Sequence, residues 1–345
     1  MTEKEELKFS VVIPVFNMAE TIGDSISSVL NQTYQNFEII VQDNDSTDKT
    51  AEVVMSFSDS RIHYFKNDTN IGYRNNLIAG WKNSKGDILY YLGADDVLSK
   101  NALIETSAAF WIDENIGAVT RPYFWFQEDI NIPIRITPVL NEKKDDVVAI
   151  DDFPKAIIAL HNEILGQVSG LAFRKKYLRD NFFTRDNEWI AHGFPFINVF
   201  KDHPVVFLKN YQVAVRIGHN TMRENGYTAY KISPTTRWVD MLDEIFFEKE
   251  YQEFKNYFIK KVIASNFIGL VQIRCYSRFK FLLREMWYLL KYRWQNIFSW
   301  RFWFFSLGCI IMPKSILARM VDWYKNRINS KIIKKIDFQY DINRN

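Results

Sequence analysis

Cysteine is scarce in this chain, and the sequence begins without an apolar leader. Two of the 345 residues are cysteine, Cys275 and Cys309, too few for the disulfide framework of a small secreted domain. The first residues, MTEKEELKF, lack the apolar core of a signal peptide, so we do not expect export by that route. Both absences favour the reducing environment of the cytoplasm.

Long apolar runs, internal repeats and low-complexity linkers are missing as well. The longest nearly uncharged run of the C-terminal part, residues 302–312, has eleven residues, whereas a membrane-spanning helix needs about 20. Apolar residues nevertheless make up 47% of the chain, which argues against wholesale disorder. The length fits one large α/β domain and a smaller appendage.

Acidic residues are depleted towards the C-terminus. Between Arg274 and Lys335 there are fourteen lysines and arginines but two acids, Glu285 and Asp322, which gives a net charge of +12. Since the whole chain has a formal charge of +3, the remainder carries −9. An acidic body joined to a basic tail indicates an anionic partner for the tail, either a membrane surface or a nucleic acid.

Short apolar runs alternate with helical patterns in the first half of the chain. Four strands are predicted there, at FSVVIPV, FEIIV, RIHYF and DILYYL. Strands that alternate with helices predict right-handed crossovers and an α/β fold with a mostly parallel sheet. Ligands of such sheets bind beyond the carboxyl ends of the strands. Three prolines between residues 121 and 150 predict a loop-rich excursion.

Acidic side chains follow two of the predicted strands. Asp43 comes directly after the second strand, where a carboxylate can accept a hydrogen bond from the imide N–H of uracil. Its neighbours Asp45 and Asp48 are explained as well by turns and helix caps. Asp95 and Asp96 follow the fourth strand, and adjacent carboxylates repel each other unless a cation neutralises them. Oxygen ligands of this kind suit Mg²⁺ or Mn²⁺, although a solvated Asp-Asp turn also explains the pair in isolation.

The order and spacing of these clusters resemble the family 2 glycosyltransferases, which have the GT-A fold. The matching stretches are SVVIPVFNMAETI, SVLNQTYQNFEIIVQDNDSTDKT and NIGYRNNLIAGWKNSKGDILYYLGADDVL, with a weaker echo at 166–219. We therefore expect a GT-A-like domain at 1–225, with a nucleotide half at about 1–120 and an acceptor half at about 121–225. A helical, basic and aromatic extension is expected at 226–345.

The resemblance implies a donor site that holds a nucleotide-sugar. Asp43 would contact the base, and Asp95 matches the metal-holding acid of the family's Asp-x-Asp motif, with Asp96 beside it and Mn²⁺ or Mg²⁺ as the cofactor. Gly93 stands where the family's first motif acid often lies near the donor ribose, so one ribose contact is missing or supplied elsewhere. Further residues implied at the donor site are Pro14, Phe16, Asn17, Glu20, Asn70, Gly72 and Asn76.

Inverting transfer also needs a base that takes the proton of the acceptor hydroxyl. Related proteins usually place an Asp at the start of a helix in the acceptor half, and the corresponding helix here brings His192 to that position. Imidazole, with an ordinary pKa near ~6.5, can act as a base around neutrality. A structural hydrogen bond of a helix-start histidine is the alternative, and Asp186 and Glu188 just upstream are the reserve candidates.

Two residues of a later loop are further candidates. His219 matches the family's histidine after the last strand and could approach the diphosphate or the metal, while Arg223 could pair with phosphate oxygens. A surface loop explains both residues equally well.

The tail between residues 279 and 312 interleaves aromatic residues with arginine and lysine. Such a composition suits a helix lying in the interface of an anionic membrane, which predicts a cytoplasmic protein peripheral on the inner face of the membrane. A helical subdomain packed on the catalytic body is the alternative.

Together the patterns predict an inverting, metal-assisted transfer of a sugar from a UDP-sugar to a glycan or lipid-linked acceptor. A sugar nucleotidyltransferase would need a glycine-rich loop after the first strand, but PVFNMAE contains no glycine. A catalytically inactive nucleotide- or glycan-binding module remains an alternative because of Gly93 and His192. A nucleic-acid binder would leave the acidic clusters unexplained, so we expect no nucleic-acid partner.

Overall fold

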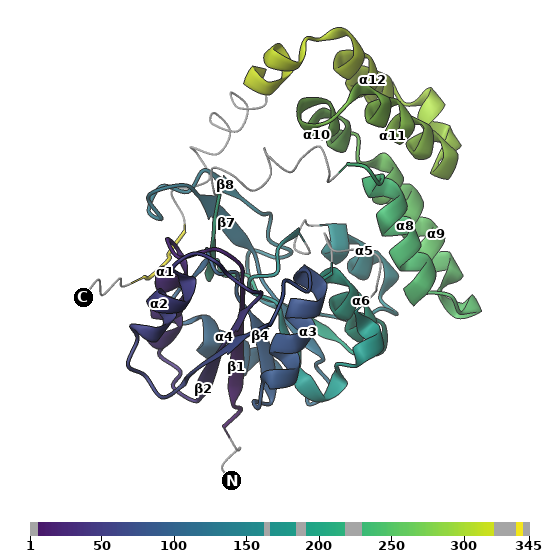
Figure 1. Ribbon diagram of the computed structural model, residues 1–345. Coiled ribbons are helices and arrows are strands. Elements are labelled where there is room, and N and C mark those ends of the chain that lie inside the picture. Colours follow the sequence, from purple (N-terminus) through teal and green to yellow (C-terminus); the bar gives the residue numbers. More distant parts are fainter. Residues whose placement is uncertain (1–5, 162–165, 184–190, 218–229, 321–335, 341–345) are drawn as a thin grey trace. The chain divides into compact units, whose positions relative to one another are not determined.

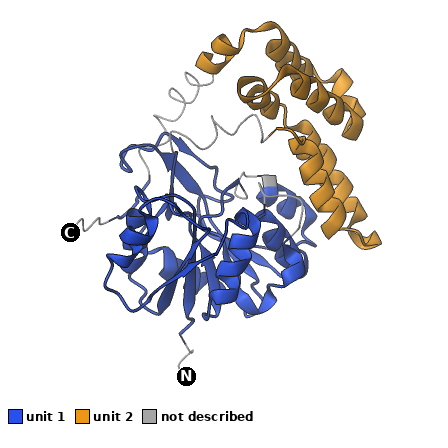
Figure 2. Cartoon of the chain, in the orientation of Figure 1, with its two compact units in different colours: residues 1–217, 333–345 blue, residues 218–332 orange. Residues whose placement is uncertain are grey.

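The chain forms two compact units in a computed structural model that describes residues 6–161, 166–183, 191–217, 230–320 and 336–340. One unit comprises residues 1–217 and 333–345, and the other residues 218–332 (Figure 2). Four candidates from the sequence, Asp186, Glu188, His219 and Arg223, lie outside the described residues.

An eight-stranded sheet forms the centre of the first unit, in the order β3-β2-β1-β4-β10-β6-β11-β9 (Figure 1). Neighbouring pairs from β3 to β4 are parallel, and β10 and β9 run antiparallel to their neighbours. The strands are β1 (Phe9–Val15), β2 (Phe37–Asp43), β3 (Ile62–Lys66), β4 (Ile88–Tyr91), β6 (Ala118–Thr120), β9 (Asp146–Val148), β10 (Ala172–Arg174) and β11 (Val205–Phe207).

The apolar runs in the sequence form strands because both faces of the sheet are covered. All residues of β2 and β4 are buried, as are all but one of β1, a pattern typical of central parallel strands. Helix α3 packs against β1 and β2 (Figure 1). The helices of this unit are α1 (Ile22–Leu30), α2 (Thr50–Met55), α3 (Tyr73–Asn83), α4 (Ala102–Phe110), α5 (Phe153–His161) and α6 (Gly193–Asp202), with short 3₁₀ turns η2 (Lys175–Tyr177) and η3 (Asp180–Phe182).

The expectation of a loop-rich excursion over residues 121–150 was wrong in part. This stretch contributes β9 to the large sheet and two strands to a small sheet of order β5-β12-β7-β8. The strands were missed because they are short and separated by prolines, which obscures any period of two. The small sheet consists of β5 (Val97–Leu98), β7 (Tyr123–Phe126), β8 (Arg135–Ile136) and β12 (Val213–Arg216).

Residues 336–340 pack on the first unit, although the sequence grouped them with the helical extension. The ring of Phe338 meets that of Phe124 edge-on, with centroids 5.0 Å apart. The backbone N–H of Lys100 donates a hydrogen bond to the carbonyl of Gln339 at 3.0 Å. The end of the chain thus adds to the apolar cluster beneath the small sheet.

The described part of the second unit is helical and has a separate apolar core, in which Leu270, Leu282 and Phe302 are fully buried. None of the described helices is long and apolar enough to cross a bilayer. They are α8 (Pro234–Ile245), α9 (Gln252–Lys261), α10 (Ile268–Tyr276), α11 (Phe279–Tyr292) and α12 (Trp300–Ile311), joined by the 3₁₀ turns η5 (Lys249–Tyr251), η6 (Ile263–Ser265) and η7 (Trp294–Phe298).

Candidate active site

Hydrogen bonds connect the loop that follows β1 to the loop that follows β2. Asn17 has a positive φ of 54°, and its side-chain oxygen accepts a hydrogen bond from the backbone N–H of Thr47 at 2.8 Å. Asp48 accepts one from the backbone N–H of Ala19 at 3.0 Å. Asn17 therefore holds together the two loops at the edge of the sheet where β1 and β2 end. The predicted donor residues Phe16 and Glu20 are exposed.

Pro14, another predicted donor residue, is half-buried within β1. Its backbone pairs in parallel register with Gln42 of β2, so it lies in the sheet one residue before the strand ends. This placement brings Pro14 next to the two fastened loops.

Asp43 lies at the end of β2 and has no exposed surface. Its carboxylate accepts hydrogen bonds from the backbone N–H of Ser46, at 2.7 Å, and from the hydroxyl of Tyr64. Loss of this carboxylate would leave both donors without their acceptor, which costs about 1–3 kcal/mol of stability for a buried group. An Asp43→Ala variant would therefore confound folding with donor binding.

Asn76 belongs to a network of side-chain amides that the sequence analysis did not foresee. Its Nδ2 donates to the carbonyl of Gln42 at 2.9 Å, and its Oδ1 accepts from Asn67 at 2.8 Å. Asn67 donates also to Asn44, which in turn donates to Asn70. The network ties the ends of β2 and β3 to the start of α3. Asn76 is buried and holds this scaffold, whereas Asn70 is exposed.

Asp95 and Asp96 follow β4 and differ in their surroundings. Asp96 is buried, and its two carboxylate oxygens accept hydrogen bonds from the hydroxyl of Ser169 and, at 2.9 Å, from the backbone N–H of Arg216. Asp95 is half-buried. Burial raises the pKa of both carboxyls, and the charge of Asp95 raises that of Asp96 further. Two negative charges here are therefore unfavourable without a compensating cation.

This pair fits the chemistry of a Mg²⁺ or Mn²⁺ site that a substrate completes. Within the described ranges, no group of three or more His, Cys, Asp or Glu side chains could hold a metal. Mg²⁺ commonly takes one or two protein carboxylates together with substrate phosphates, so the pair is sufficient. Asp95 would be the principal protein ligand, because Asp96 is already held by Ser169 and Arg216.

Arg216, at the end of β12, adds a positive charge that the sequence analysis did not assign. Its Nε donates to the backbone carbonyl of Asp95 at 3.2 Å, and its guanidinium forms an ion pair with Asp24 at 2.7 Å. The same group lies over the ring of Phe126. An arginine at the end of a predicted strand, three residues before His219 in the sequence, was the available signal.

Gly93 is required by the packing of this loop. A Cβ at this position would lie 2.8 Å from Asp96 Oδ2 and 3.2 Å from Ser169 Oγ. The backbone N–H of Gly93 also donates to Ser169 Oγ at 2.8 Å. Ser169 and Asp96 thus fill the space where the family's first motif acid would begin, which explains the departure at Gly93.

We expect Gly93→Ala to lower the free energy of unfolding by about 1–3 kcal/mol, because the new Cβ would push Asp96 Oδ2 away from its hydrogen bond with Ser169. Thermal unfolding followed by circular dichroism measures the change. Gly23→Ala in α1 is the matched control, since its Cβ would meet only Val53 at an ordinary 3.6 Å. Equal melting temperatures for the two variants would contradict the packing explanation.

His192 lies at the start of α6, beside the first residue of α3. It is buried, and its Nδ1 lies 3.5 Å from the hydroxyl of Tyr73, the first residue of α3. Burial raises the pKa of Tyr73 well above its ordinary value, and the charges of Asp96 and Asp95 raise it further. Tyr73 therefore lies within electrostatic reach of the carboxylate pair and beside His192. The sequence did not single out Tyr73.

The arrangement as a whole is that of a GT-A glycosyltransferase: a largely parallel sheet with a carboxylate pair beyond β4. The chain belongs to glycosyl transferase family 2, whose sequence profile matches residues 10–183, just over half of the chain. The match includes Asp43, Asp95 and Asp96 but ends before His192.

Curated relatives align over part of their length. The chain is 38% identical over 108 residues to the UDP-Glc:alpha-D-GlcNAc-diphosphoundecaprenol beta-1,3-glucosyltransferase WfgD of Escherichia coli. That alignment covers 31% of this chain and 42% of WfgD. It is 26% identical over 217 residues to an uncharacterised glycosyltransferase of Haemophilus influenzae, with 59% and 56% covered. The alignments thus span less than two thirds of each of these relatives.

Solved structures share the fold over nearly the whole chain. TarS of S. aureus, residues 1–349 with UDP-GlcNAc, matches with a TM-score of 0.63 and 14% identity, covering 93% of this chain and 90% of that one. The mannosyltransferase PcManGT of Pyrobaculum calidifontis, with GDP-Man and Mn²⁺, has a TM-score of 0.52 at 14% identity, covering 95% and 89%. One fold thus accommodates both uridine and guanosine donors.

Proposed function

We propose that this protein transfers a sugar from a UDP-sugar, with inversion at the anomeric carbon, to a hydroxyl of a glycan or lipid-linked acceptor. The observation that carries the proposal is the Asp95–Asp96 pair beyond β4, together with His192, whose Nδ1 lies 3.5 Å from the hydroxyl of Tyr73 at the start of α3. A base for the acceptor hydroxyl and carboxylates that would hold a cation at the departing diphosphate are the two features that such a transfer uses.

The residues divide the chemistry between them. A bound Mg²⁺ or Mn²⁺ held by Asp95 would stabilise the negative charge that develops on the departing diphosphate. Ser169 and the backbone N–H of Arg216 hold Asp96, and Arg216 Nε donates to the backbone carbonyl of Asp95. The imidazole of His192 takes the proton of the acceptor hydroxyl, and the Tyr73 hydroxyl positions the ring through Nδ1.

The donor class can be tested by binding alone. We expect UDP to bind at least about tenfold more tightly than GDP in the presence of Mn²⁺, because the family resemblance places the base at the end of β2, where the buried Asp43 carboxylate is bonded to Ser46 and Tyr64. Isothermal titration calorimetry measures both affinities. As a probe of the Asp43 carboxylate, Tyr64→Phe is better than a change of Asp43 itself. It removes one hydrogen bond of the carboxylate and leaves the bond from Ser46 in place. Equal affinities for UDP and GDP would contradict the uridine assignment.

The acceptor is proposed from the relatives. WfgD is named for a sugar carried on diphosphoundecaprenol, and an acceptor of that class is lipid-linked. Work on such an acceptor would place this protein in the cytoplasm, peripheral on the inner face of the membrane.

Release of UDP from UDP-sugars, with or without acceptor, would exclude an inactive binding module. Absence of release from any UDP-sugar would contradict the proposal.

A further inference from the structure

Helix α12 exposes an apolar stripe along its whole length. Trp300 is 74% exposed, Phe304 66% and Ile311 74%, although all three are hydrophobic. Together with Leu307 they follow the spacing i, i+4, i+7 and i+11, which places them on one face of a helix. The opposite face, with Phe302, Ser306 and Cys309, is buried in the core of the second unit. The exposed stripe is therefore not needed for that core.

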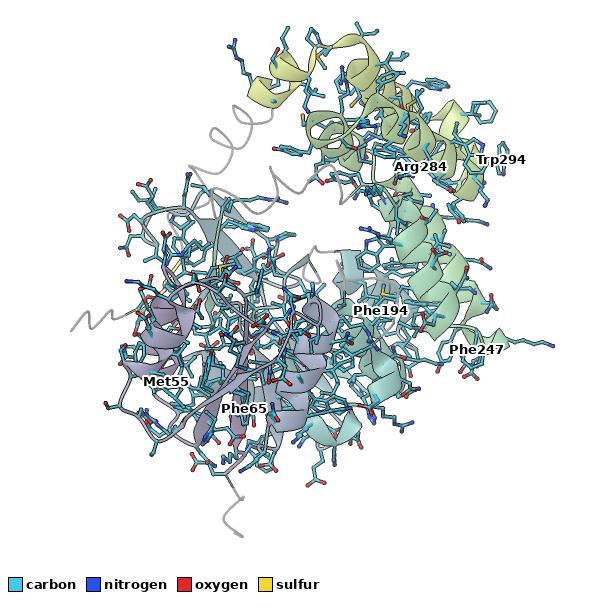
Figure 3. All side chains as sticks on the ribbon, in the orientation of Figure 1. Met55, Phe65, Phe194, Phe247, Arg284 and Trp294 are labelled. Carbon is cyan, nitrogen blue, oxygen red and sulfur yellow. The ribbon has the colours of Figure 1, made fainter. Side chains whose placement is uncertain are left out.

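The preceding turn η7 also exposes large hydrophobic side chains. Trp294 is 65% exposed and Phe298 80%, and their rings meet edge-on with centroids 6.0 Å apart. Trp294 projects away from the ribbon of the second unit (Figure 3). We call the aromatic face the set formed by Trp294, Phe298, Trp300, Phe304, Leu307 and Ile311.

Basic residues flank the aromatic face in the sequence, and acids are absent from this stretch. No aspartate or glutamate occurs between Met286 and Met320. Exposed basic side chains in the same stretch are Lys291, Arg301, Lys314 and Arg319. The stretch that carries the aromatic face is thus basic, with Asp240 and Asp243 of α8 as acidic neighbours at its start, near Lys291 and Tyr292.

We propose that the aromatic face docks on the surface of an anionic lipid bilayer. Aromatic rings and long aliphatic side chains enter the headgroup boundary, while flanking lysines and arginines stay at the level of the phosphates. The described helices are too short and too little apolar to cross a bilayer, which leaves docking parallel to the surface. A second copy is disfavoured as the occupant, because the basic stretches of the two copies would repel each other.

The docking does not depend on the proposed glycosyltransfer. It concerns the second unit, whereas the catalytic residues lie in the first. A failure of either idea therefore leaves the other to be judged on its own measurements.

Flotation of the full-length protein with lipid vesicles tests the proposal. We expect binding to vesicles of phosphatidylcholine and phosphatidylglycerol, and much weaker binding to phosphatidylcholine alone. High salt should weaken the binding without abolishing it, because inserted rings are not screened. Absence of binding to anionic vesicles at low salt would overturn the proposal.

The double variant Trp300→Gln, Phe304→Gln locates the surface. It should lower the vesicle partition coefficient by about tenfold or more, because two apolar side chains no longer enter the boundary. The control Phe247→Gln, in the same unit and 70% exposed, should bind like the unchanged protein (Figure 3). Melting temperatures of all variants should be equal, since the three side chains are exposed.

Two other outcomes would assign the face differently. A dimer in sedimentation that the double variant converts to a monomer, with no vesicle binding by the unchanged protein, would make it a self-association surface. Binding of single-stranded RNA in place of vesicles, lost in the double variant, would make it a nucleic-acid surface. Either result overturns the lipid proposal.

Discussion

Asp95→Asn is expected to lower kcat/KM by about 10³-fold. The amide keeps the shape of the side chain but removes the charge that would hold a divalent cation beside the diphosphate, a contribution of several kcal/mol to transition-state stabilisation. Mn²⁺ titrations of activity and of UDP binding should both shift to higher concentrations. Excess EDTA should abolish turnover by the unchanged protein.

Asp45→Asn is the matched control for this change. Asp45 also lies in a loop beyond a strand end, but it is half-buried and forms an ion pair with Lys66 at 3.6 Å. A pair that water reaches in this way contributes little to stability, so activity and melting temperature should change little. Full turnover in excess EDTA, or equal activities of the two variants, would exclude the metal-assisted mechanism.

His192→Ala is expected to lower kcat by about 10²–10⁴-fold while leaving the affinity for UDP nearly unchanged. The imidazole would act on the acceptor proton, so its loss affects a step that follows donor binding. Steady-state kinetics and calorimetry with UDP separate the two effects. A loss smaller than about tenfold would remove His192 from the mechanism, and Asp186 and Glu188 would be tested next.

His203, which follows the other end of α6, is the control for the alternative that His192 has only a structural role. His203 stacks on Tyr177 with ring centroids 3.6 Å apart, and burial lowers its pKa. His203→Ala should destabilise the protein without a specific loss of kcat. Tyr73→Phe should lower kcat more modestly than His192→Ala and leave KM unchanged, as expected for a positioning residue.

The sequence predicted the strands of the nucleotide half because their apolar runs are long and lie in the buried centre of the sheet. The first strand was placed at its observed bounds, and the second differs only in its end. The parallel arrangement then required the residues after β1, β2 and β4 to meet at one edge. This geometric rule placed the Asp95–Asp96 pair at that edge, whereas its interpretation as a metal site came from the resemblance to the family 2 glycosyltransferases.

The contacts that hold the site together could not be predicted in this way. Ser169 and Arg216 reach Asp96 from 73 and 120 residues away in the sequence, and no local period reports such a pairing. The same holds for Tyr73 and His192, which are 119 residues apart. The amide network was missed for another reason, since asparagines near strand ends are indistinguishable from turn residues until their partners are known.

The two hydrogen bonds of Asp96 have a consequence for how a cation and a nucleotide would affect each other's binding. Since Asp96 is bound to Ser169 and Arg216, the pair would offer a cation little more than the Asp95 carboxylate, and a diphosphate would have to complete the coordination. Cation and nucleotide would then be linked thermodynamically: each alone would bind weakly, and the factor by which one tightens the other would be the same in both directions. Occupancy of this site would follow the product of two concentrations, so that the cellular level of free Mn²⁺ or Mg²⁺ would tune the apparent affinity for the sugar donor.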